Sequence, residues 1–250
     1  MEYLATIYIP DFDAQPGEDA GDGEGRSMGE AYARFHQLAG AFIRGGEALQ
    51  PPATAIAVRG GGPGADAPLV TDGPFVETAE VIGGYYVLQG DDRAEVESVV
   101  GQIPAASLPG GFVEVQPLAM TWSPDVHVAA RAGETRYLAV NYRPAAAVTL
   151  PGSPAWQEDA LRHEQFQRKH ADALVAAAAL DPGAAVSTVR MHDGRATTSE
   201  GPAMAADHVV VGFYLVRAAS AADARALAQD IPTVPGGGVE LRPVVEFADR

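Results

Sequence analysis

A histidine on the apolar face of a helix is the first residue of this sequence that could do chemistry. Apolar residues recur around it at the spacing of a helix: Met28, Tyr32, Phe35, Ala39, Phe42 and Ile43. On a helical wheel, His36 lies about 40° from Tyr32 and therefore on this apolar face. An imidazole there needs a partner or a cavity, and a carboxylate would orient it and raise its pKa. The alternative is a core histidine that is bonded to a backbone carbonyl.

One histidine and one carboxylate of the first half recur in the second half of the chain. His36 recurs as His170, 134 residues later, and the turn sequence Asp72-Gly73-Pro74-Phe75 recurs as Glu200-Gly201-Pro202-Ala203. Glycine takes unusual backbone angles and proline fixes the next residue, so both sequences predict a turn. The recurrence keeps an acid–base role and a structural role equally open for the histidines.

The sequence motifs for metals and cofactors are incomplete. His163 and His170 would lie about 10.5 Å apart along a helix, which is too far for one metal ion. The acidic segment Asp11–Gly25 does not match a calcium-binding loop. The glycines of Gly60–Gly64 are not followed by the Lys and Ser or Thr of a phosphate-binding loop. We therefore expect neither a metal nor a cofactor.

The charge of the chain excludes some partners. It has 250 residues, with 17 basic and 33 acidic side chains and a net charge of −16. Nucleic-acid binding and a membrane-surface patch both need clustered Lys and Arg, and lysine occurs only once, at Lys169. There is no cysteine, no run of 18 apolar residues and no signal-like start. We expect a cytoplasmic globular protein.

The two halves of the sequence repeat each other. Three pairs of segments match in order: Tyr3-Leu4-Ala5 with Tyr137-Leu138-Ala139, Gly84-Tyr85-Tyr86 with Gly212-Phe213-Tyr214, and Val113–Leu118 with Val239–Val244. A period of more than 100 residues indicates duplicated domains and not a solenoid. We predict one domain over residues 1–119, a linker over 120–133, and a second, diverged domain over 134–250.

Each half predicts strands that alternate with two helices. In the first half we expect strands over residues 3–9, 54–58, 81–88 and 113–116, helices over 28–43 and 92–103, and a mobile acidic loop over 11–25 that could cover a site. Gly45-Gly46 should stop the first helix, and Asp91-Asp92 should cap the second. This order predicts an α+β, ferredoxin-like unit with one apolar sheet face left to bury.

The turn and its surroundings resemble the YCII-related family, also called DGPF-domain proteins. The resemblance rests on the Asp72-Gly73-Pro74-Phe75 turn, the Glu77-Thr78 pair, the Gly83-Gly84-Tyr85-Tyr86 strand, the Ile103-Pro104 helix end and the Val113–Pro117 strand. It covers nearly all of residues 1–119 and is weaker over 135–247. It implies that two ferredoxin-like units form a dimeric α/β-barrel arrangement. A tandem chain would build this pseudo-dimer internally, as a monomer or a small homo-oligomer.

The resemblance also implies candidate catalytic residues. The family's suggested acid–base pair corresponds to His36 and Asp72, with His170 and Glu200 as a diverged counterpart whose surroundings are emptied by Ala203. The first hypothesis is a cofactor-independent enzyme that uses this pair on a small organic molecule. The alternatives are a non-catalytic metabolite-binding or transcription-linked regulatory protein, and a purely structural role. We expect the first half, with its fuller motif, to carry the site.

Overall fold

A computed structural model of the chain describes residues 1–10, 22–60, 68–76, 80–122, 131–203 and 207–246. The first repeat contains β1 (Glu2–Pro10), α1 (Asp22–Ala39), β2 (Ile43–Ala48), β3 (Ile56–Arg59), β4 (Leu69–Asp72), β5 (Glu80–Gln89), α2 (Arg93–Val100) and β6 (Phe112–Trp122). The second contains β7 (Thr135–Pro144), α3 (Pro154–Lys169), β8 (Leu174–Leu180), β9 (Ser187–His192), β10 (Arg195–Glu200), β11 (His208–Ala218), α4 (Ala221–Asp230) and β12 (Gly238–Pro243). The same order of elements occurs twice, which makes the fold a duplicated α+β arrangement.

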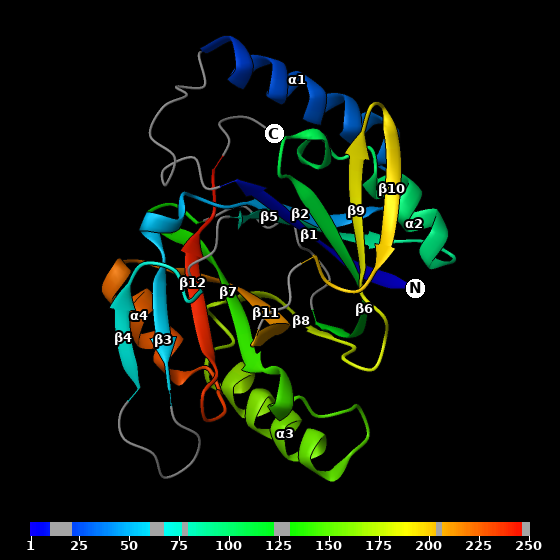
Figure 1. The fold of residues 1–250 in the computed structure, drawn as a ribbon. Coiled ribbons are helices and arrows are strands. Elements are labelled where there is room, and N and C mark those ends of the chain that lie inside the picture. Colours follow the sequence, from blue (N-terminus) through cyan, green and yellow to red (C-terminus); the bar gives the residue numbers. More distant parts are fainter. Residues whose placement is uncertain (11–21, 61–67, 77–79, 123–130, 204–206, 247–250) are drawn as a thin grey trace. The chain divides into compact units, whose positions relative to one another are not determined.

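The two compact units of the structure are not the two repeats. Unit 1 consists of Met1–Ala48, Thr78–Pro117 and Ala185–Met204, and unit 2 of Leu49–Glu77, Leu118–Ala184 and Ala205–Arg250. Each unit therefore contains a hairpin from the other repeat. In Figure 1 the cyan hairpin β3–β4 lies beside the red strand β12, and the yellow hairpin β9–β10 lies beside the green β6. The predicted domain boundaries describe the two sequence repeats, and as domain boundaries they stay a prediction.

The sheet of unit 1 has the strand order β2-β5-β1-β6-β9-β10, with antiparallel pairing throughout. Its core joins Phe35 and Ala39 of α1 and Val96 and Val100 of α2 to the side chains of the strands. Because successive side chains of a strand point to opposite faces, this core covers one face of the sheet with both helices.

Unit 2 repeats this arrangement with the strand order β8-β11-β7-β12-β3-β4. Its core joins Phe166 of α3 and Leu227 of α4 to Tyr137, Ala139 and Leu241 of the strands. The last residues of β6, from Leu118 to Trp122, pair with β8 at the edge of this sheet. In each unit the hairpin from the other repeat extends the sheet on the side of the repeat's last strand.

The predicted cap of the second helix is confirmed, whereas the first helix begins and ends earlier than predicted. Asp92 accepts a hydrogen bond of 2.9 Å from the backbone N–H of Glu95 and is the N-cap of α2. Helix α1 ends at Ala39, and Ile43 already belongs to β2. Gly45 and Gly46 lie inside that strand. Position 46 requires a glycine, because a Cβ there would lie 2.5 Å from the carbonyl oxygen of Tyr85 in β5.

The predicted acidic loop is partly helix. Residues 11–21 lie outside the described residues, so the predicted lid stays a prediction. Residues 22–25 belong to the first turns of α1, which corrects this part of the expectation. None of the described helices is long and apolar enough to cross a membrane.

Candidate functional site

The two predicted histidines have different kinds of partner. His36, on α1, lies with its Nε2 2.7 Å from the hydroxyl of Tyr86 in unit 1. His170 follows the last residue of α3 in unit 2, and its Nε2 lies 2.9 Å from Oδ2 of Asp230. The hydrogen bond from Lys169 is the largest cause that holds the pKa of Asp230 below its usual range. Partial burial opposes this shift, and the hydrogen bond with His170 adds to it.

The two predicted carboxylates each form an ion pair with an arginine of a helix. Asp72 contacts Arg225 of α4 in unit 2. The next residue, Gly73, has a φ of 100°, as the predicted turn requires. Glu200, followed by Gly201 at φ 90°, contacts Arg93 of α2 in unit 1. His36 and Asp72 thus belong to different units, as do His170 and Glu200. The pairing of these residues and their catalytic role stay predictions.

The repeated sequence pattern aligns His36 with His170, but the structure shifts this alignment by three residues. Where α1 ends, Phe42 N donates to Ala39 O at 2.8 Å, and where α3 ends, Ala173 N donates to His170 O at 2.9 Å. His170 therefore corresponds to Ala39. The connection between the first strand and the first helix is three residues shorter in the second repeat. Three residues are close to one helical turn, so the sequence alignment is wrong by about one turn.

The corrected match places different residues at the two sites. Phe35 and Phe166, both buried, hold their rings 5.2 and 4.9 Å from those of Tyr86 and Tyr214. His36 then corresponds to Gln167, which hydrogen-bonds the hydroxyl of Tyr214. The residue that corresponds to Tyr32 is His163, 131 positions later. The conserved feature of the duplication is a hydrogen-bonded tyrosine, and not a recurring histidine.

A glutamate in the last strand of each repeat binds the turn of the exchanged hairpin. The backbone N–H of Phe75 donates to Oε2 of Glu240 at 2.8 Å, and the N–H of Ala203 donates to Oε1 of Glu114 at 2.8 Å. Burial raises the pKa of Glu114, against the opposing hydrogen bonds. Because a buried carboxylate needs partners, these bonds tie each hairpin to the unit of the other repeat.

An aromatic ring is stacked on a tyrosine in both units, but it comes from different segments. In unit 2 the ring of Phe75, on the exchanged hairpin, stacks on Tyr142 at 4.9 Å. In unit 1 the ring of Phe112, on β6 itself, stacks on Tyr8 at 4.7 Å. An arginine covers each ring: Arg59 over Phe75 at 4.2 Å, and Arg190 over Phe112 at 4.7 Å.

The expectation that Ala203 leaves an emptied space is wrong, because Phe112 supplies the ring. In unit 2 the position of Phe112 is held by Gly238, where an added Cβ would lie 2.4 Å from the ring of Phe75. The two units therefore use complementary pairs, Phe75 with Gly238 and Ala203 with Phe112. Each hairpin matches the unit in which it lies.

A buried cluster of charged side chains lies between α3 and β7 in unit 2. Asp159 of α3 forms ion pairs with Arg143 of β7 and, at 2.7 Å, with Arg162. His163 Nε2 lies 4.0 Å from Asp159 Oδ1, and His163 Nδ1 lies 2.7 Å from the hydroxyl of Tyr214. The cluster thus contains two guanidinium groups for one carboxylate.

The histidine and the tyrosine of this cluster are neutral near pH 7. Burial and the charges of Arg143 and Arg162 lower the pKa of His163 from 6.5 to about 4. Burial raises the pKa of Tyr214 to about 12. A neutral imidazole that is hydrogen-bonded to a neutral phenol can donate or accept a proton, but it adds no charge.

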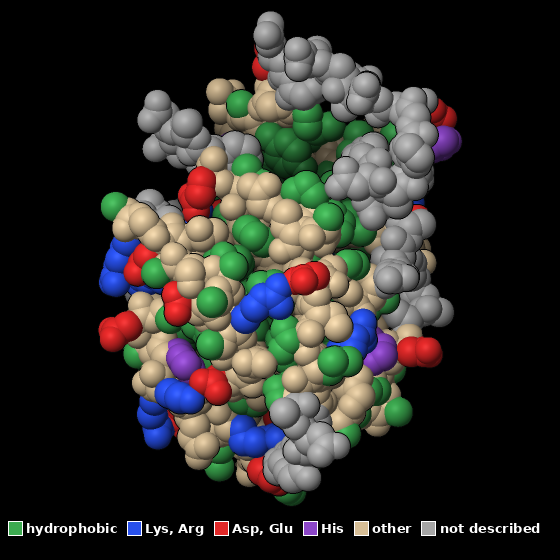
Figure 2. Space-filling model, turned by 90° about the vertical axis from the view of Figure 1, so that its left-hand side faces the viewer, with side chains coloured by type: hydrophobic (Ala, Val, Ile, Leu, Met, Phe, Trp, Pro, Cys, Tyr) green, Lys and Arg blue, Asp and Glu red, His purple; other side chains and the backbone are tan. Residues whose placement is uncertain are grey.

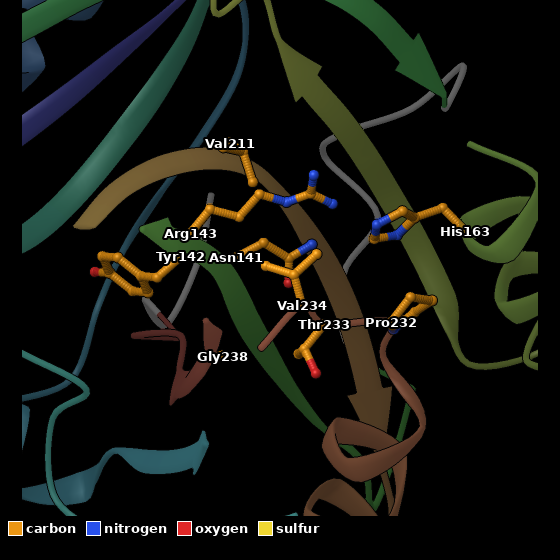
Figure 3. Close-up of a pocket in the computed structure, with 9 residues that line it drawn as sticks. All are labelled: Asn141, Tyr142, Arg143, His163, Val211, Pro232, Thr233, Val234 and Gly238. Atoms are coloured by element: carbon orange, nitrogen blue, oxygen red, sulfur yellow. The ribbon is translucent and has the colours of Figure 1, made fainter. Parts of the chain in front are cut away.

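A small pocket opens beside this cluster. It is lined by Asn141, Tyr142, Arg143, His163, Val211, Pro232, Thr233, Val234 and Gly238, and its enclosed part has room for about one water molecule. Figure 3 shows Asn141 and Arg143 extending from β7 on the side of His163, whereas the ring of Tyr142 points the other way. Val211 lies at a β-bulge between β11 and β7, a feature that often shapes sites.

The corresponding positions of unit 1 are apolar. In the sheets, Ile7 pairs with Gly84 and Val113, as Asn141 pairs with Gly212 and Val239. By the same register Ile9 corresponds to Arg143, and its side chain covers Gly83. Ile7 belongs to the core of unit 1, and Ile9 and Tyr32 pack against it. The fold therefore holds together at this place without polar side chains.

The residues of this site were not predicted from the sequence, because they do not recur in the two halves. Asn141, Arg143 and Asp159 have apolar counterparts in the first repeat, and His163 corresponds to Tyr32. The available signal was the pair of polar residues at alternate positions in Asn141-Tyr142-Arg143, within an otherwise buried strand. Among the described residues, no group of three or more His, Asp or Glu side chains is placed to hold a metal ion.

The comparison with known families agrees with the duplication. The sequence model of the YCII-related domain matches the chain twice, over residues 28–121 and over residues 136–248. No curated protein matches the chain.

Proposed function

The chain belongs to the YCII-related domain family, and from this premise we propose that it binds a small organic anion in the pocket of unit 2. The observation that carries this proposal is the surplus positive charge beside the pocket. Asp159 neutralises one of the two arginines, Arg143 and Arg162, and His163 is neutral near pH 7. One positive charge is left for a ligand.

Arginine suits such a ligand because its planar guanidinium matches the two oxygens of a carboxylate. Arg143 is 7% exposed, and it lines the pocket together with Asn141. A charge in so buried a place interacts more strongly than one at the surface. The enclosed part has room for about one water molecule, so it can take a group of about one non-hydrogen atom, and the rest of the ligand would lie in the open part of the pocket.

Titration of the whole chain with propionate and with its neutral analogue propionamide tests this proposal. We expect propionate to bind and propionamide to bind at least tenfold more weakly. The double variant Arg143→Ile and Asp159→Met, which introduces the residues of the matching unit 1 positions, Ile9 and Met28, should lose binding. It should keep the fold, because removing both partners of a buried ion pair is often tolerated. Equal binding of both compounds, or binding that survives in the variant, would overturn the proposal.

The second candidate is cofactor-independent acid/base chemistry on the bound molecule. It is favoured by the neutral His163, whose Nδ1 is held by Tyr214 while its other nitrogen lies on the side of Asp159. The pair His36 and Asp72, with His170 and Glu200, remains the competing assignment that the family resemblance suggests.

Two matched variants distinguish these assignments. His163→Asn and His36→Asn each remove a histidine that lies 2.7 Å from a tyrosine hydroxyl. A role of His163 requires that only the first variant changes binding or turnover. A loss in the second variant alone would transfer the site to unit 1.

We also propose that the two units form a pseudo-dimer of the dimeric α/β-barrel type, because in each unit the helices and the core cover one face of the sheet. The chain would then be a monomer or a small homo-oligomer, which light scattering would distinguish. A regulatory role would proceed without direct contact with DNA. On the face in Figure 2 the basic side chains of the described residues lie singly and near acidic ones, and the net charge is −16.

A further inference from the structure

Asn141 has an unusual place for an amide side chain. It lies in the middle of β7, between Gly212 of β11 and Val239 of β12, and it is 8% exposed. Among the described residues, no atom forms a hydrogen bond with its buried Oδ1. A buried acceptor without a donor is costly, and in native proteins such a group calls for an explanation.

The fold itself does not require an amide at this position. Ile7 occupies the same register position in unit 1 and is buried in the core there, at 4% exposed. Isoleucine satisfies the sheet, the bulge and the helix packing equally well. The amide therefore serves something that unit 1 lacks, and the pocket that Asn141 lines is such a feature.

The position of Asn141 relative to Arg143 indicates what the ligand would offer. Residues two apart in a strand lie on the same face, with Cα atoms about 7 Å apart. Figure 3 shows both side chains extending on the same side of β7. A molecule whose carboxylate meets Arg143 can therefore bring a group on a neighbouring carbon to Asn141. The enclosed part of the pocket has room for about one water molecule, which is the size of a hydroxyl.

We infer that Asn141 is the specificity residue of this pocket and selects small 2-hydroxycarboxylates, whose hydroxyl donates a hydrogen bond to Oδ1 while the carboxylate binds Arg143. This inference rests on the proposed function, because it assumes that an anion binds beside Arg143. It adds the donor on the carbon next to the carboxylate as the feature that is recognised.

Calorimetric titration with three carboxylates of similar size tests this inference. Lactate carries the hydroxyl on the carbon next to the carboxylate, 3-hydroxypropionate carries it one carbon further away, and propionate has none. The wild-type chain should bind lactate about tenfold more tightly than the other two, the usual effect of one satisfied buried hydrogen bond. In the Asn141→Ile variant, which carries the residue of unit 1, the ratio of the affinities for lactate and propionate should fall from about ten to about one.

The outcomes separate this inference from the proposed function. Equal affinities of the wild-type chain for lactate and propionate would overturn the role of Asn141 and leave anion binding intact. A preference for lactate that persists in Asn141→Ile would overturn it as well. If none of the three compounds binds, the proposed function and this inference both fail. The comparison of lactate with propionate in the wild-type chain needs no variant and decides the inference even if Asn141→Ile does not fold.

Discussion

The same place in the two units, between the first helix of a repeat and its first strand, is apolar in unit 1 and polar in unit 2. Unit 1 fills it with Ile7, Ile9 and Tyr32, which belong to its core or pack on it. Unit 2 places Asn141, Arg143 and His163 at the matching positions and opens a pocket there. Because the backbone arrangement is the same, the polar cluster is not a requirement of the fold. The difference supports the proposal that the binding site lies in unit 2.

The unit that contains the pocket is built from both repeats. Its strand β7 and helix α3 come from the second repeat, whereas the hairpin with the complete Asp-Gly-Pro-Phe turn comes from the first. The expectation that the half with the fuller motif carries the site stays a prediction, and in the structure the turn of that half belongs to unit 2. The complete turn and the polar cluster belong to one unit, although 66 residues separate Phe75 from Asn141 along the chain.

The largest effects are expected from the rings that match each hairpin to its unit. Phe75→Ala should lower the free energy of unfolding by about 3–5 kcal/mol, because Gly238 offers no side chain to fill the space. Ala203→Phe should cost about 1–3 kcal/mol, because the new ring meets Phe112. Adding Phe112→Gly to Ala203→Phe reproduces the arrangement of unit 2 and should relieve this overpacking. Denaturant unfolding of the three variants and of Phe112→Gly alone gives the coupling between the two positions.

A strictly additive cost in this cycle would contradict the complementarity of the two pairs. It would mean that the exchanged hairpins are held by strand pairing and by the backbone hydrogen bonds to Glu114 and Glu240, without a contribution from matched rings.

The next effect concerns pH and separates the two histidine sites. The pKa of His163 is lowered from 6.5 to about 4, so the native chain resists a proton that the unfolded chain accepts. The contribution of His163 to the free energy of unfolding is therefore fully present above pH 6.5. It is lost as the pH falls from 6.5 to about 4, by up to about 3 kcal/mol. Urea unfolding across this range should show the loss in wild type and in His36→Asn. His163→Asn should remove this contribution, and an unchanged pH profile would show that His163 does not cause it.

The smallest effect is expected from the carboxylates of the two turns. Asp72 and Glu200 have side chains that are 81% and 70% exposed, and each pairs with one arginine. Exposed ion pairs contribute little, so Asp72→Asn and Glu200→Gln should each change the free energy of unfolding by less than about 1 kcal/mol. A loss of ligand binding or turnover in Asp72→Asn, with stability unchanged, would instead support the catalytic role that the family resemblance implies.

The duplication, the α+β order of the elements and the turns could be predicted from the sequence. Two domains of one family follow from the repeated segments, and the turn residues Gly73 and Gly201 take the positive φ that the Gly-Pro sequences predict. Asp92 caps its helix because a carboxylate before the first turn accepts the free N–H groups of that turn. These features depend on residues that are close in the chain, so local spacing suffices to predict them.

The sequence does not predict which hairpin joins which unit or where the polar residues meet, because both depend on contacts between distant parts of the chain. Strands of either hairpin offer the same backbone hydrogen bonds to either unit, so the sequence pattern does not choose between them. Side-chain packing distinguishes them, through Phe75 against Gly238 and Ala203 against Phe112. The pocket also depends on packing. Arg143 and Asp159 meet because a strand and a helix pack together, and their spacing along the chain does not predict that contact.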